Sequence, residues 1–199
     1  MAKVIVAAVQ LVSRATLPPN LEAVKRVVGN AAASGASVVV LPEYWGILGH
    51  NETDKVNLRE SYQESPKAHE QPMQHCMQEL AKKHAIYLIG GTIPLKSPLH
   101  EGKVLNTTLV YNPNGNVIGR YDKVHLFGFT PGNGERAFDE GRTIDAGDSN
   151  QRPVVNLLCG PVGLSVCYDL RFPEWYRAMG PLSMIVVPAA FTYVTGKAH

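Results

Sequence analysis

The sequence predicts an α/β or α+β fold in which helices pack outside a mixed sheet. Short, continuous apolar runs rich in β-branched residues recur along the chain, as in strands that are buried on both faces. Amphipathic helical patterns separate some of these runs, and a strand–helix–strand order implies a parallel pair with a crossover helix. A chain of 199 residues can bury a substantial core as one domain, here residues 1–199.

The first third of the chain contains the predicted parallel pair. Residues 4–9 are expected to form a buried strand. Asn20 is then expected to cap a helix of helically spaced apolar residues, and Gly35 to end it. Residues 37–41 read as the second buried strand, and residues 72–84 as a second helix with one apolar face.

The middle of the chain predicts a hairpin. Residues 86–89 form another apolar strand, and residues 105–111 and 117–121 flank the turn sequence Asn112-Pro113-Asn114-Gly115. These two strands are therefore expected to be antiparallel neighbours.

The last third predicts three more strands and a short helix. Residues 154–158 and 162–166 are strand-like on either side of Cys159-Gly160-Pro161. Pro173 is expected at the first position of a short helix, and residues 184–187 form a last strand.

Composition narrows the function classes. Hydrophobic residues make up 45% and charged residues 18%, which is typical of soluble globular proteins and excludes general disorder. The net charge of +2 is too balanced to indicate a nucleic-acid or membrane-surface partner, and no apolar run approaches the ~18 residues of a membrane span. The three cysteines form no CxxC pair, so a reducing, cytoplasmic location is expected, with no metal site.

Three reactive residues each follow a predicted strand. These are Glu43, Lys123 and Cys167. A carboxylate can take the proton of a thiol, and an ammonium can stabilise both the thiolate and the oxyanion of an acyl-transfer intermediate. Taken singly, each has an ordinary interpretation: Glu43 as a loop charge, Lys123 as a lysine at a sheet edge, and Cys167 as a small buried apolar residue. Their spacing alone leaves open whether they meet.

Three ordered motifs carry a resemblance. The strings Leu41-Pro42-Glu43, Tyr121-Asp122-Lys123-Val124-His125-Leu126-Phe127 and Gly163-Leu164-Ser165-Val166-Cys167-Tyr168-Asp169-Leu170-Arg171-Phe172-Pro173-Glu174 resemble the signature segments of the nitrilase superfamily of carbon–nitrogen hydrolases. The chain is most similar to the branch of amidases that act on deaminated glutathione and on ω-amides of dicarboxylic acids.

This resemblance implies a fold and a chemistry. The fold would be a four-layer αββα sandwich. Cys167 would be the nucleophile, Glu43 the general base and Lys123 the oxyanion stabiliser, with the backbone N–H of Tyr168 completing the oxyanion hole. The substrate would be a small linear carboxamide, no cofactor would be needed, and the protein would form a homodimer or a higher homo-oligomer.

Three further residues have alternative interpretations. By the resemblance, Glu140 orients the substrate amide or relays protons; otherwise it is a solvated loop charge. Arg171 either binds a substrate carboxylate or forms an ion pair within its loop. His125 is interpreted as structural, because a base is already assigned.

The resemblance leaves open how much of the family's fold this chain contains and which substrate it takes. Family members continue beyond the segment matching Thr195-Gly196-Lys197-Ala198-His199, so the sandwich is expected to lack its C-terminal part. Substrate choice is expected to depend on walls formed by residues 44–71 and 127–141. The alternatives are N-carbamoyl or nitrile hydrolysis, or a catalytically silent truncated homologue.

Overall fold

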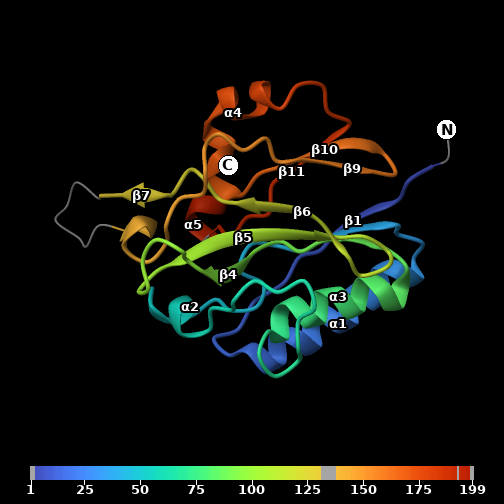
Figure 1. Cartoon of the computed structure of the whole chain (residues 1–199), viewed down its shortest axis with the longest axis horizontal. Coiled ribbons are helices and arrows are strands. Elements are labelled where there is room, and N and C mark those ends of the chain that lie inside the picture. The colour runs from blue at the N-terminus through green and yellow to red at the C-terminus, as the bar shows by residue number, and fades with distance from the viewer. Residues whose placement is uncertain (1–2, 131–137, 192, 198–199) are drawn as a thin grey trace.

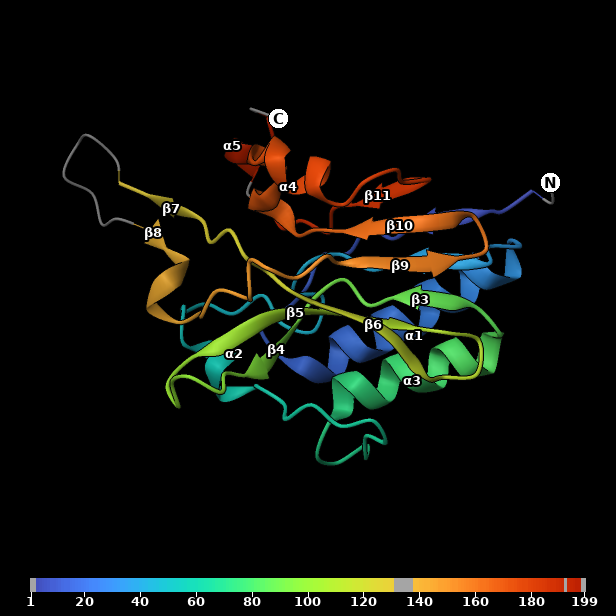
Figure 2. The same ribbon diagram turned by 45° about the horizontal axis from the view of Figure 1, so that its top comes forward.

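Two stacked sheets lie between outer helices, which is the four-layer arrangement that the resemblance implies (Figures 1 and 2). The computed structural model describes residues 3–130, 138–191 and 193–197. Helices α1 (Leu17–Ala33) and α3 (Pro72–His84) cover the outer face of the larger sheet, and α4 (Pro173–Ala178) lies beyond the smaller one. Within the described residues, no helix combines the length and apolar character needed to cross a membrane. Residues 198 and 199, which end the matching segment that begins at Thr195, lie outside the described residues.

The larger sheet has six strands in the order β1-β2-β3-β5-β4, with β6 paired to β5. The parallel pairing of β1 with β2 across α1, and the antiparallel β5–β6 hairpin, confirm the predicted connections. Strand β4 was not predicted, because it is short and contains Pro94; it lies at the sheet edge, where a proline is tolerated. The six strands are β1 (Val6–Ala8), β2 (Val38–Val40), β3 (Tyr87–Ile89), β4 (Ile93–Lys96), β5 (Val104–Tyr111) and β6 (Val117–Asp122).

The smaller sheet has the order β11-β10-β9. Strands β9 and β10 are antiparallel and are joined by Leu158 and Cys159, so Gly160 and Pro161 belong to β10 rather than to the connection, and β11 is parallel to β10. The remaining elements are short. The strands of the smaller sheet and these short elements are β9 (Val154–Leu157), β10 (Gly160–Leu164), β11 (Met184–Val186), the β7–β8 ribbon (Gly128–Phe129 and Phe138–Asp139), helices α2 (Asp54–Asn57) and α5 (Tyr193–Gly196), and the 3₁₀ turns η1 (Glu140–Arg142) and η2 (Cys167–Arg171).

Two apolar cores hold the layers together. One lies between the helices and the larger sheet, where Val24 and Val28 of α1 and Met77 of α3 are fully buried. The other lies between the two sheets, where Ile89 and Val162 belong to one cluster. Each fully buried aliphatic side chain contributes about 1.5–3 kcal/mol of transfer free energy, so the stacking of the sheets sets the position of every strand end.

Asn20 does not cap α1 as the sequence suggested. The helix begins at Leu17 with prolines in its first turn, where a missing N–H costs no hydrogen bond. Asn20 is instead buried within the helix, and its side-chain amide bonds both backbone groups of Arg14 and the carbonyl of Gly46 at 2.8–2.9 Å. The prediction was wrong because the partners of this amide are distant in sequence.

Candidate active site

The ends of three strands bring Glu43, Lys123 and Cys167 together. Glu43 lies three residues after β2, Lys123 directly follows β6, and Cys167 lies three residues after β10. The Nζ of Lys123 is 3.2 Å from Oε1 of Glu43, and the Glu43 carboxylate lies close enough to Cys167 to raise the pKa of its thiol, after burial. The three groups that the motifs single out therefore lie close together, as hydrolysis by this trio requires.

Both oxygens of the Glu43 carboxylate accept additional hydrogen bonds. Nδ2 of Asn106 donates to Oε1, and the N–H of Ala190 donates to Oε2, each at 2.9 Å. Glu43 is only 5% exposed, so these donors replace water around its charge.

Asn106 is a site residue that the sequence did not indicate. It lies in β5, where it is fully buried. Its backbone carbonyl accepts a hydrogen bond from the backbone N–H of Lys123 at 2.9 Å. Its side-chain oxygen Oδ1 has no hydrogen-bond partner among the described residues. No signal in the sequence indicated this role, because the complete burial of β5 is known only from the structure.

The Lys123 ammonium is fully buried and lies between two carboxylates. It contacts Glu140 at 2.9 and 3.1 Å in addition to Glu43. Burial alone would lower its pKa, but the negative charges of Glu43 and Glu140 outweigh that effect, and the pKa of Lys123 is raised. Lys123 is therefore positioned as a permanent cation beside the thiol.

Glu140 is not the solvated loop charge that the sequence left as an alternative. It is buried at the start of η1, where Oε2 also accepts the N–H of Phe127 at 2.8 Å. A carboxylate paired in this way fixes the lysine rather than facing solvent. A direct contact between Glu140 and substrate stays a prediction.

The thiol of Cys167 is held in the protonated form. Burial, followed by the nearby Glu43 charge, raises its pKa to about 12. The residue has a φ of +48°, the left-handed region that L-residues avoid, at the first position of η2. The turn places this partly buried sulfur near the carboxylate, which would have to take its proton before it could react.

Asp169 ties the cysteine turn to the lysine segment. Its fully buried carboxylate accepts hydrogen bonds from the Tyr121 hydroxyl at 2.7 Å, from Nδ1 of His125 at 2.7 Å and from the Val166 N–H at 2.8 Å. Tyr121 and His125 lie two residues before and after Lys123. This contact gives His125 the structural role that the sequence favoured.

Tyr168 and Arg171 differ in their relation to the site. Tyr168 follows the cysteine, its ring packs edge-on against Phe127 and Phe172, and its backbone N–H meets no acceptor among the described residues. Arg171 is exposed at the end of η2. The oxyanion role of Tyr168 and the carboxylate-binding role of Arg171 stay predictions.

A cavity of about 260 Å³ opens beside Glu43. Its described lining comes from residues 43–55 together with Phe138, Glu140 and Ala190, which agrees with the two segments expected to form the walls. Residues 131–137 of the second segment lie outside the described residues. Lys123 and Cys167 are not among the described lining residues, and Glu43 and Ala190 connect the cavity to them.

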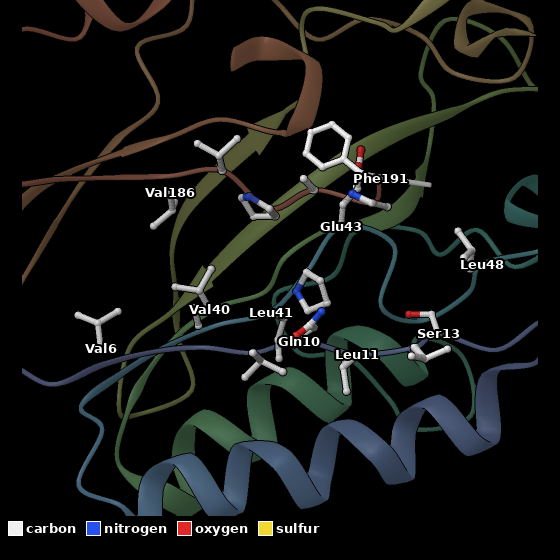
Figure 3. A pocket seen from close by; sticks show the side chains of 18 of the residues that line it. Val6, Gln10, Leu11, Ser13, Val40, Leu41, Glu43, Leu48, Val186 and Phe191 are labelled. Carbon is white, nitrogen blue, oxygen red and sulfur yellow. Dashed lines mark hydrogen bonds between the residues drawn. The ribbon is translucent and has the colours of Figure 1, made fainter. Parts of the chain in front are cut away.

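A larger apolar groove of about 780 Å³ meets this cavity at Glu43 (Figure 3). Val6, Val40 and Val186 lie toward one end of the groove, and Glu43 and Phe191 lie toward the other. The groove runs between β1 and β2 of the larger sheet and β11 of the smaller one. Glu140 and Lys55 line only the smaller cavity, so the polar chemistry is concentrated there.

Backbone packing places the Glu43 loop. Gly91 has a φ of +54°, and a Cβ at this position would overlap the carbonyl oxygen of Pro42. The hydroxyl of Thr92 accepts the N–H of Tyr44 at 2.9 Å, and Tyr44 also has a left-handed φ of +49°. The link between β3 and β4 therefore holds the chain on both sides of the glutamate.

Comparisons with known proteins agree with the motifs and the fold. The sequence is 35% identical to a deaminated glutathione amidase of Synechocystis over 195 residues, which cover 97% of this chain and 68% of that protein. It is 39% identical to the human omega-amidase NIT2 over 126 residues, which cover 62% of this chain and 43% of that protein.

Solved structures show the same arrangement. Nit3 of Saccharomyces cerevisiae, described as a member of branch 10 of the nitrilase superfamily, superposes with a TM-score of 0.80 at 28% identity, covering 98% of this chain and 67% of that one. NitFhit of Caenorhabditis elegans has a TM-score of 0.83 at 32% identity, and the match covers 98% of this chain and 45% of that one. The chain spans only part of the length of each relative. Residues 5–197 match the carbon-nitrogen hydrolase family model, and with these relatives the match shows that the chain belongs to the carbon–nitrogen hydrolase family.

Proposed function

We propose that this chain hydrolyses the C–N bond of a linear carboxamide through a thioester on Cys167. The observation that carries the proposal is the Glu43 carboxylate, which pairs with the Lys123 ammonium and lies near enough to Cys167 for its charge to act on the thiol. Family membership supports the same reaction type.

The arrangement supports a two-step mechanism. Glu43 accepts the thiol proton, and the thiolate attacks the amide carbonyl carbon. Lys123 and the Tyr168 N–H stabilise the resulting oxyanion. The protonated Glu43 then donates its proton to the leaving nitrogen, so that ammonia departs and a thioester remains. Water, activated by Glu43, attacks the thioester, which releases the carboxylic acid and restores the thiol.

The names of the relatives suggest the first substrates to test. Relatives of this chain are described as deaminated glutathione amidase and as omega-amidase. We propose an amide of this type, with N-carbamoyl compounds and nitriles as the alternatives. The experiment measures ammonia release by the 199-residue chain from a panel of ω-amides, N-carbamoyl amino acids and nitriles.

Removal of the nucleophile tests the mechanism. Cys167→Ala should abolish ammonia release while leaving the circular dichroism spectrum unchanged. Cys159→Ala is the matched control, because this second partly buried cysteine lies in the β9–β10 turn away from Glu43. Turnover that survives Cys167→Ala would refute the thioester, and an ordered but inactive parent chain would favour the catalytically silent alternative.

We further propose a cytoplasmic location and a homodimeric or higher homo-oligomeric state. All three cysteines are free thiols, which fits a reducing compartment. Fractionation of cells that express the chain, and sedimentation of the purified protein, test these two proposals separately.

A further inference from the structure

A second lysine faces the cavity beside Glu43, and the proposed mechanism does not use it. Lys55 lies in α2 and lines the 260 Å³ cavity together with Glu43, Tyr44 and Glu140. Its place in the sequence gives no sign of this, because a lysine in a polar loop is usually solvated.

The position of Lys55 is fixed by its neighbour in the sequence. Val56 is buried in a small apolar cluster with Tyr44, Val104 and Ile144, which anchors α2 against the larger sheet. The Nζ of Lys55 lies 5.6 Å from the centroid of the Tyr44 ring, within the range of a cation–π contact. The ammonium is therefore held over the residue that directly follows Glu43.

The Lys55 ammonium is not ion-paired with the carboxylates around it among the described residues. Lys123 contacts both of its carboxylates within 3.2 Å, whereas no hydrogen bond or ion pair joins Lys55 to any residue in the described ranges. Glu52, in the turn before α2, also lines the cavity, but no ion pair joins it to Lys55 in the part of the chain that the structure describes. Burial lowers the pKa of Lys55, and the charges of Glu140, Glu52 and Glu43 oppose that shift.

The cavity needs this cation if it is to accept an anion. The carboxylates of Glu43, Glu52 and Glu140 line it, and a negatively charged substrate would be repelled wherever no positive charge compensates them. Among the described lining residues, Lys55 is the lysine that could do so. The hydroxyl of Tyr44, which is buried and has no described partner, is a further polar group beside it.

We propose that Lys55 determines specificity by binding a carboxylate of the substrate that lies distal to the scissile amide. This inference rests on the proposed function and deepens it: Lys55 would be the residue by which the site favours an ω-amide with a free carboxylate over a simple aliphatic amide. The amide end would meet Cys167, and the free carboxylate would pair with the Lys55 ammonium in the adjoining cavity. The competing interpretation is that Lys55 only balances the charge of Glu140.

Paired substrates test the assignment. Ammonia release is measured for succinamate and glutaramate and for neutral amides of matched length, butyramide and valeramide. Lys55→Met should reduce the kcat/KM ratio of anionic to neutral amide by roughly tenfold or more, through KM for the anionic substrate. Lys55→Arg should retain most of the preference, because its charge is kept. Lys83→Met, at an exposed position on α3, is the control.

A binding measurement separates this proposal from the proposed function. Titration of the Cys167→Ala chain with glutarate requires no turnover, and the added Lys55→Met substitution should weaken binding by roughly tenfold or more. Equal glutarate affinity with and without Lys55, or an unchanged substrate preference, would overturn the assignment even if the chain is an active amidase. If Lys55→Met weakens glutarate binding but the parent chain releases no ammonia from any amide, the assignment of Lys55 is supported and only the proposed function is contradicted.

Discussion

In the proposed mechanism, the Glu43 side chain has two opposing effects on Cys167. Its negative charge, after burial, raises the pKa of Cys167, so the thiol stays protonated and protected in the absence of substrate. The same carboxylate is the nearest group able to take the proton when substrate arrives. Storage of the nucleophile and its activation therefore depend on one side chain.

Glu43→Gln should separate these two effects. Loss of the negative charge, with Lys123 retained, is expected to lower the pKa of Cys167 below about 12 while ammonia release falls by roughly 100-fold or more. Alkylation of Cys167 by iodoacetamide, followed by mass spectrometry across pH, measures the thiol, and Cys159 in the same sample is the internal control. An alkylation midpoint that stays in place or moves to higher pH would contradict this account.

Lys123 should matter for stability as well as for catalysis. Lys123→Met leaves the buried carboxylates of Glu43 and Glu140 without their shared cation. Breaking a buried ion pair costs about 3–5 kcal/mol, so the free energy of unfolding should fall by about that amount. Urea unfolding measures it, with Lys83→Met as a control expected within about 0.5 kcal/mol of the parent. A loss below about 1 kcal/mol would mean that water reaches these carboxylates.

At the scale of elements, the η2 turn and the segment after β6 behave as one unit. The Asp169 carboxylate accepts hydrogen bonds from Tyr121 and His125 on one side and from Val166 on the other. A shift of either element would break bonds to a fully buried charge. The distance between Lys123 and Cys167 is therefore set by a residue that touches neither.

Asp169→Asn tests this coupling. An amide cannot accept all of these hydrogen bonds, so the free energy of unfolding should fall by about 1–3 kcal/mol, and kcat should fall more than KM rises. Urea unfolding and ammonia release measure the two effects. Asp148→Asn, at an exposed aspartate, serves as the control. If KM changes and kcat does not, Asp169 does not position the reacting groups.

The sequence predicted the elements better than the contacts between them. The apolar runs and the turn at Asn112 located most strands, because burial and turn chemistry are local properties. Strand β4 was missed because Pro94 lowers its local strand signal, and Asn20 was misread because its partners lie in other loops. Likewise, Glu43, Lys123 and Cys167 came from motif strings, whereas Asn106 and Lys55 became visible only once the sheets were stacked.

At the scale of the whole molecule, one end of the sandwich presents apolar surface. The 780 Å³ groove runs between β1, β2 and β11, and β11 pairs on one side only among the described strands. Val6 in β1 is 40% exposed and Ile185 in β11 is 46% exposed. An open strand edge beside apolar side chains favours pairing with another strand.

We expect a second copy of this chain to cover that surface. Sedimentation velocity over a range of concentrations should show self-association, and Ile185→Lys should weaken it, because a charge on an edge strand opposes strand pairing. Leu158→Lys, at a 60% exposed position in the β9–β10 turn, should have little effect. A monomer at every concentration, or equal effects of both substitutions, would show that this edge is not the contact.

The packing of Gly91 against Pro42 has a consequence for how the protein tolerates mutation. Since even a methyl group at position 91 would displace the loop that carries Glu43, a saturation library should recover glycine alone there. A residue without any functional group would then rank with the reactive ones in such a screen. Intolerance to substitution in this region would therefore reflect close packing of the backbone as well as the reactivity of side chains.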